Sequence, residues 1–110
     1  MDLVNEIFRK NEELTASIKR LRQNGVLLAE AEKNYKIALR TEALKLRQEK
    51  GMPVTLISQI IFGVPEVADL RFKRDVAQTV YDTNMEHINC TKLQIRILEA
   101  QLSREWSNAK

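Results

Sequence analysis

The sequence predicts an all-α fold in which two long antiparallel helices form a coiled-coil-like hairpin, joined by a short apolar helix. Three observations support this prediction. The 110 residues include only three glycines and two prolines, which leaves few turns. Apolar residues recur at helical spacing through two long stretches. Between these stretches, residues 51–67 read GMPVTLISQIIFGVPEV and contain both prolines and two of the glycines.

The first long helix is expected over about residues 2–50, because no proline interrupts this stretch. Its apolar stripe is Leu3, Ile7, Leu14, Ile18, Leu21, Leu28, Tyr35, Leu39 and Leu46. Asn24-Gly25 is a common turn sequence. However, the seven-residue repeat continues through Gly25 without a shift, which predicts a helix that is continuous or at most kinked there.

The short helix is expected over residues 55–62. Gly51 and Pro53 end the preceding helix, Thr55 is placed to cap the new one, and Gly63 closes it. Its apolar residues have two interpretations: they plug the open end of the hairpin, or part of them stays exposed and binds a partner protein. This candidate protein-binding set is Leu56, Ile57, Ile60, Ile61 and Phe62.

A helix-turn-helix is a third interpretation of the same region, with Gly63 as its turn glycine. Gln59 would then occupy a position that needs a small residue, and Asp69 one that needs an aliphatic residue. Glu66 and Asp69 would also meet the phosphate backbone with the wrong charge. Both features disfavour this motif.

The second long helix is expected over residues 65–106, because Pro65 suits a first helical turn and Glu66 suits its positive end. Its stripe alternates threes and fours: Val67, Leu70, Arg74, Ala77, Tyr81, Asn84, Ile88, Thr91, Ile95, Leu98 and Leu102. Arg74, Asn84 and Thr91 are polar. Polar residues within such a stripe lower stability but specify register.

Both helices carry further apolar residues beside these stripes: Val26, Leu27, Ala31, Ile37, Ala38 and Leu44 on the first, and Val76, Val80, Cys90, Leu93 and Ile97 on the second. One hairpin buries a single stripe of each helix, so we expect a homodimer that resembles a four-helix bundle. The alternative is a monomer in which the short helix covers part of the excess. Whether the chain is a dimer or a monomer, its length predicts that residues 1–110 form a single helical domain.

Composition excludes several classes of function. The net charge of +3 is mildly basic, and the single cysteine, Cys90, permits no disulfide within the chain and favours a reducing, cytoplasmic setting. The first residues lack the pattern of a signal peptide, and no apolar run approaches the roughly 20 residues of a membrane span.

The chain has few of the residues that catalytic sites use: it has one histidine and one cysteine, and it lacks a glycine-rich phosphate loop. His87 and Cys90 share a helical face, but tetrahedral zinc needs four ligands. We therefore expect a protein that is not an enzyme, with no metal, no cofactor and no small-molecule substrate.

A basic helix face supports an alternative, which is nucleic-acid binding without sequence reading. Helical spacing places four of the basic residues on one face of the first helix, and three more lie near the same end of the hairpin. A solvated helix face explains the pattern equally well. The candidate residues are Lys33, Lys36, Arg40, Arg47, Arg71, Lys73 and Arg74.

The segments LVNEIFRKNEELTASIKRLRQNG, GMPVTLISQII and LEAQLSREW resemble uncharacterised small α-helical proteins encoded by temperate phages of Gram-positive bacteria. The resemblance spans nearly the whole chain and carries no catalytic or binding motif. It implies an accessory protein in the cytoplasm of a bacterial host, acting on a phage or host protein such as a defence, nuclease or replication machine. The alternative that it leaves open is a nucleic-acid-binding accessory protein in phage replication or recombination.

Overall fold

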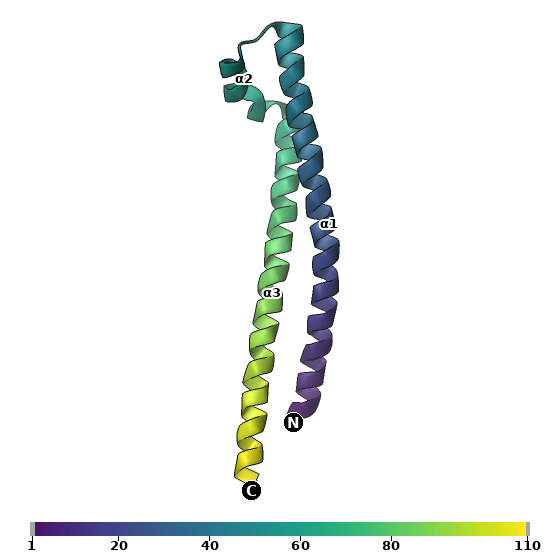
Figure 1. Cartoon of the computed structure of the whole chain (residues 1–110), viewed down its shortest axis with the longest axis vertical. Helices are drawn as coiled ribbons and strands as arrows, with labels where there is room; N and C mark the ends of the chain where they lie inside the picture. Colours follow the sequence, from purple (N-terminus) through teal and green to yellow (C-terminus); the bar gives the residue numbers. More distant parts are fainter. Residues whose placement is uncertain (1, 110) are drawn as a thin grey trace. The chain divides into compact units, whose positions relative to one another are not determined.

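A computed structural model describes residues 2–109 and contains no β-strand within that range. Its elements are the helices α1 (Leu3–Lys50) and α2 (Val54–Ile60), the 3-10 turn η1 (Ile61–Gly63) and the helix α3 (Pro65–Ala109) (Figure 1). The predicted all-α order of long, short and long helices is confirmed.

Helix α1 runs without interruption through Asn24-Gly25, as the unbroken heptad repeat predicted. A glycine inside a helix costs about 1 kcal/mol relative to alanine. Leu21 and Leu28, one turn to either side, are both partly buried. Packing on both sides of Gly25 therefore outweighs the local preference for a turn.

The end of α1 depends on Gly51, whose φ of 60° lies in the left-handed region that glycine tolerates best. The turn lets the backbone N–H of Met52 donate to the carbonyl of Leu46 at 3.2 Å. This hydrogen bond ties the turn after α1 back to the last part of the helix.

Helix α2 begins differently from the prediction. Thr55 was expected to cap it, but Pro53 occupies the N-cap position and its carbonyl accepts from the backbone N–H groups of Leu56 and Ile57 at 3.1 and 3.0 Å. Pro53 already has the extended backbone that an N-cap requires, with φ −61° and ψ 144°, so the cap prediction for Thr55 is wrong. The helix then tightens into η1 rather than continuing to residue 62.

Helix α3 begins at Pro65, as predicted, and extends to Ala109, three residues beyond the expected end at Trp106. The whole predicted stripe is buried or partly buried: Val67, Leu70, Arg74, Ala77, Tyr81, Asn84, Ile88, Thr91, Ile95, Leu98 and Leu102.

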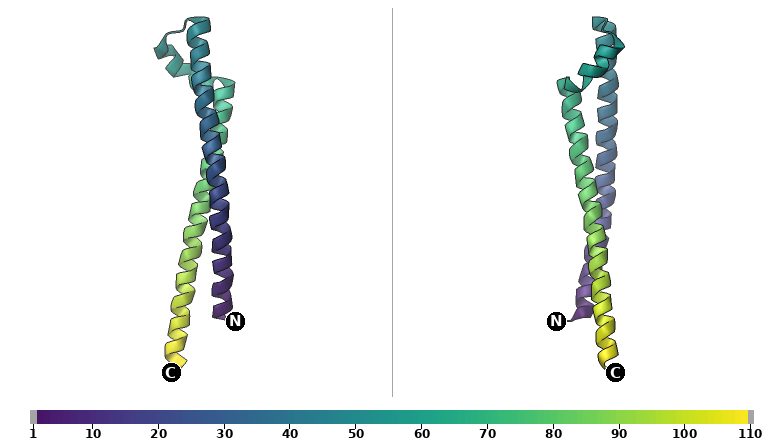
Figure 2. Two further views of the ribbon diagram at one scale, coloured as in Figure 1. Left: turned by 45° about the vertical axis from the view of Figure 1, so that its right-hand side comes forward. Right: turned by 90° about the vertical axis from the view of Figure 1, so that its left-hand side faces the viewer.

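The chain divides into two compact units. The middle unit, Asn24–Val80, holds the second part of α1, all of α2 and η1, and the start of α3. Its α1 and α3 segments run antiparallel, and both views in Figure 2 show α2 and η1 beside them. Its core is Tyr35, Ile57, Ile61 and Val67, surrounded by Leu39, Ala43, Leu46, Met52, Val64 and Leu70.

The terminal unit combines α1 up to Gln23 with α3 from Tyr81 onward. Its interior is partly polar: Ser17, Asn84 and Thr91 are buried together with Ile88 and Ile95. The Asn84 amide donates to the backbone carbonyl of Ser17 at 3.2 Å, which joins the two helix segments. The Thr91 hydroxyl instead donates to the carbonyl of His87 on its own helix at 2.9 Å.

Candidate protein-binding surface

The α2–η1 segment divides into a buried side and an exposed side. Ile57 and Ile61 are only 7% and 4% exposed and belong to the core of the middle unit. This burial agrees with the interpretation in which the short helix plugs the hairpin. Because Ile57 and Ile61 are buried, they are not available to contact a partner protein. Leu56, Ile60 and Phe62 remain 42%, 39% and 43% exposed. We call these three residues the α2–η1 patch.

Helical geometry holds this patch together. Leu56 and Ile60 are four residues apart and therefore lie on the same flank of α2. Phe62 follows on η1. Ile57 and Ile61, on the same short segment, are buried in the core and hold its backbone in place. The positions of the three exposed side chains are therefore set by this core packing.

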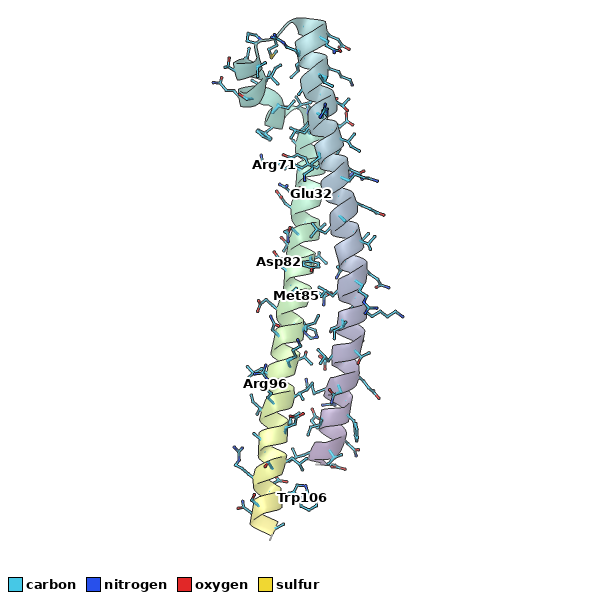
Figure 3. All side chains as sticks on the ribbon, in the orientation of Figure 1. Glu32, Arg71, Asp82, Met85, Arg96 and Trp106 are labelled. Carbon is cyan, nitrogen blue, oxygen red and sulfur yellow. The ribbon has the colours of Figure 1, made fainter. Side chains whose placement is uncertain are left out.

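A cation borders the patch. The guanidinium of Arg71, on α3, lies 4.8 Å from the centroid of the Phe62 ring, and Figure 3 labels Arg71 on α3 in the part of the unit that holds α2 and η1. Such a cation–π contact stabilises the ring position by about 0.5 to 1 kcal/mol at an exposed site. Arg71 is one of the predicted nucleic-acid-binding residues, and the structure places its guanidinium over an aromatic ring.

Arg74 is also engaged within the middle unit. Its guanidinium lies 4.7 Å from the Tyr35 ring centroid, and its nitrogens approach Asp75 at 2.8 Å and Glu32 at 3.6 Å. The hydrogen bond to Asp75 raises the pKa of Arg74 above its ordinary value, with smaller contributions from the charges of Asp75 and Glu32. Figure 3 labels Glu32 on the side of α1 toward α3, consistent with this ion pair. The guanidinium of Arg74 therefore contacts residues of its own chain.

Three other predicted basic residues also have partners in their own chain. Lys36 pairs with Glu32 at 3.5 Å and Lys73 with Asp69 at 3.3 Å. Arg47 donates to the backbone carbonyl of Met52 at 3.0 Å. These contacts are exposed, and exposed ion pairs contribute about 0 to 1 kcal/mol each, so they do not prevent an exchange of partner.

Lys33 and Arg40 are exposed and form no ion pair with any residue in 2–109. They are seven residues apart on α1, and Arg47 lies seven residues further. Lys33, Arg40 and Arg47 therefore form a short basic row on one face of α1, in which Arg47 already has a hydrogen-bond partner.

His87 and Cys90 lie on α3 in the terminal unit, and both are exposed. His87 Nε2 lies 3.3 Å from a carboxylate oxygen of Glu13. Within residues 2–109, no three histidine, cysteine, aspartate or glutamate side chains gather closely enough to hold a metal ion. The same part of the chain also contains no helix long and apolar enough to cross a membrane.

Phe72 is among the exposed apolar residues that the sequence interpretation did not single out as apolar surface. Phe72 on α3 is 66% exposed and lies one helical turn before Val76, which Val80 follows after another turn. The spacing of four could have identified Phe72 as part of the second apolar stripe of this helix.

Comparisons with protein families, with curated proteins and with solved structures found no match to this chain. Function is therefore inferred from burial, charge and spacing. The α2–η1 patch combines three exposed apolar side chains with a short segment that Ile57 and Ile61 anchor in the core of the middle unit.

Proposed function

We propose that this chain is a non-enzymatic helical protein that forms a homodimer and binds another protein through the α2–η1 patch. One observation carries the proposal for the patch: a single short segment buries Ile57 and Ile61 while leaving Leu56, Ile60 and Phe62 in water. Exposed apolar residues on a well-supported backbone are typical of protein interaction sites.

The chemistry of the patch indicates what kind of partner it accepts. Leu56 and Ile60 offer an aliphatic surface, and Phe62 adds an aromatic ring bordered by the positive charge of Arg71. The complementary partner is a protein with apolar side chains beside one or two carboxylates. The resemblance to phage proteins suggests a host defence, nuclease or replication machine as the source of such a partner.

The proposal is tested by affinity capture from cytosol of a Gram-positive bacterium, with nuclease treatment throughout. The variant Ile60→Asp places a charge in the patch, whereas Val54→Asp places one at an exposed site near the start of α2. We expect Ile60→Asp to lose the captured protein and Val54→Asp to retain it. Binding of the purified partner should then fall at least about a hundredfold, the effect of losing roughly 2.7 kcal/mol.

Circular dichroism of each variant provides the control for folding. Ile57→Asp serves as a positive control for unfolding, because it places a charge in the core. Retained capture by a folded Ile60→Asp protein would refute the role of the patch. Equal loss with Val54→Asp would show that the whole segment, rather than the patch, is involved.

Nucleic-acid binding is the second candidate function, and the exposed row formed by Lys33, Arg40 and Arg47 favours it. The double variant Lys33→Glu/Arg40→Glu should then weaken binding to a labelled duplex, and the wild-type affinity should fall steeply with salt. Absence of a mobility shift for the wild type at low salt eliminates this candidate. The same result leaves the α2–η1 proposal intact.

A further inference from the structure

Helix α3 exposes apolar residues on a second face, away from the stripe that packs within the hairpin. In the middle unit these are Phe72, Val76 and Val80, and in the terminal unit they are Leu93 and Ile97, with Cys90 beside them. No other segment of either unit covers them, since each of the five large side chains is at least 46% exposed.

Except for Val80, which lies at the flanking position e, these residues occupy positions a and d of one heptad register. Positions a are Val76, Thr83, Cys90 and Ile97, and positions d are Phe72, Thr79, Glu86 and Leu93. The stripe that packs within the hairpin occupies positions b and f of the same repeat. The centre of the b and f positions lies about 150° around the helix from the centre of the a and d positions. Helix α3 therefore has one seam for its own chain and a second, unfilled seam.

Resting on the homodimer proposed above, we infer that the second seam of α3 pairs with the same seam of a second copy in antiparallel orientation. The two-fold axis passes between Asn84 and Met85, so that each position a meets a position d of the partner. The contacts are Phe72 with the partner's Ile97, Val76 with the partner's Leu93, Thr79 with the partner's Cys90, and Thr83 with the partner's Glu86.

This register matches apolar with apolar and polar with polar. At the two ends of the seam, Phe72 and Val76 meet aliphatic side chains. At its centre, the Thr83 hydroxyl can donate to the carboxylate of the partner's Glu86. A polar pair at the centre of an otherwise apolar seam specifies alignment.

Charges beside the seam support the same register. Asp75 occupies a position g, and its antiparallel counterpart at g is the partner's Arg96. The two-fold axis repeats this pair on the other side, and both residues are exposed. Figure 3 shows Arg96 projecting from α3 on the side away from α1, where a second copy can reach it.

Other alignments are worse. A shift of one heptad in one direction places Val76 opposite the partner's Glu86, which buries a carboxylate against an aliphatic side chain. A shift in the other direction places Glu86 opposite the partner's Cys90 and Thr83 opposite the partner's Leu93, so the central polar pair is lost as well. A parallel, in-register pair places Glu86 opposite the partner's Glu86, and like charges at that distance repel. The antiparallel register therefore follows from the sequence of the seam itself.

Cysteine crosslinking tests the inference, because Cys90 is the only cysteine of the chain. The variant Thr79→Cys places a second thiol opposite the partner's Cys90. Thr79 and Cys90 are eleven residues apart on α3, about 16 Å along the axis, so they cannot form a disulfide within one chain. Under mild oxidation we expect most of this variant to run as a covalent dimer on a non-reducing gel.

Two proteins serve as controls. The wild type should stay uncrosslinked at the same concentration, because Cys90 is about 16 Å along the axis from the partner's Cys90 in this register. Gln78→Cys introduces a thiol in the same helical turn but at position c, outside the seam, and should also stay uncrosslinked.

Light scattering of the wild type distinguishes a failure of the homodimer proposal from a failure of the antiparallel register. A mass of one chain at all concentrations overturns the homodimer and this register together. A mass of two chains without crosslinking of Thr79→Cys overturns the register alone. Efficient crosslinking of the wild type supports a parallel pair and also overturns the register. As a second measure, Ile97→Asp should raise the dimer dissociation constant at least about tenfold.

Discussion

The two units of this chain use the same pair of helices but fill their interiors differently. The middle unit buries Tyr35, Ile57, Ile61 and Val67 in one apolar cluster. The terminal unit buries Ser17, Asn84 and Thr91 between its few buried isoleucines. The comparison indicates that stability and register are provided by different parts of one hairpin.

The physical reason lies in the side chains. Burying a large aliphatic side chain contributes about 1.5 to 3 kcal/mol, whereas a typical hydrogen bond contributes about 0.5 to 1.5 kcal/mol net. Asn84 and Ser17 therefore add little stability, but a shift of the helices would break their hydrogen bond and leave a polar group buried. In the middle unit, α2 and η1 supply two of the four buried core residues, Ile57 and Ile61.

The largest expected effect comes from removing a plug residue. Ile61→Ala should lower the free energy of unfolding by about 2 to 5 kcal/mol, because it opens a cavity in the apolar core. The adjacent change Ile60→Ala affects a half-exposed side chain and should lower it by less than about 1.5 kcal/mol. Urea unfolding followed by circular dichroism measures both. Equal losses would contradict the division of the segment into a buried and an exposed side.

The next effect concerns the backbone of the middle unit. Gly51→Ala should lower the free energy of unfolding by about 1 to 2 kcal/mol, because the left-handed conformation is strained for alanine even though open space surrounds the new methyl group. Gly63 has no left-handed φ and also has open space, so Gly63→Ala should raise stability by up to about 1 kcal/mol. Thermal melts of the two variants should therefore shift in opposite directions. A shared direction would show that the turn at Gly51 is not required.

A smaller effect is expected in the terminal unit. Asn84→Ala removes the amide that reaches Ser17 and should lower the free energy of unfolding by about 1 kcal/mol. Asn89→Ala, an exposed site on the same helix, should change it by less than about 0.5 kcal/mol. Hydrogen exchange of the terminal unit should also accelerate in Asn84→Ala. A loss as large as that of Ile61→Ala would reverse the comparison between the units.

The smallest effect is expected at the His87–Glu13 pair, where the side chains of His87 and Glu13 are 44% and 37% exposed. His87→Ala should change stability by a few tenths of a kcal/mol, because a contact between partly exposed side chains is weak and any charge attraction in it is screened by salt. Melting at low and high salt measures the effect. A larger, salt-dependent loss would mean that ionic contacts contribute more to the terminal unit than its buried polar residues do.

The long helices could be predicted from the sequence because a heptad stripe is a strong signal. Every position of the α3 stripe is at least partly buried, and the repeat correctly overrode the turn preference of Asn24-Gly25. The polar residues Asn84 and Thr91 fitted the stripe as well. Periodicity identifies which face is buried, whatever side chains it carries.

The start of the short segment was harder to predict, because the residue with a capping side chain and the residue with the capping backbone are different ones. Thr55 has the side chain of an N-cap, but the backbone carbonyl of Pro53 accepts the hydrogen bonds at the start of α2. Periodicity also could not separate Ile57 and Ile61 from Leu56 and Ile60, since seven residues make barely two turns. The cation–π contacts of Arg71 and Arg74 join residues distant in sequence, and no local pattern indicates them.

Trp106 has a consequence for how this chain can be observed in solution. It is the single tryptophan and is 66% exposed, so its indole is already surrounded largely by water in the folded chain. Unfolding should hardly alter its emission colour, which makes fluorescence a poor monitor of denaturation here. A blue shift on mixing would instead report that another molecule has covered the end of α3, and the native chain needs no added dye for that measurement.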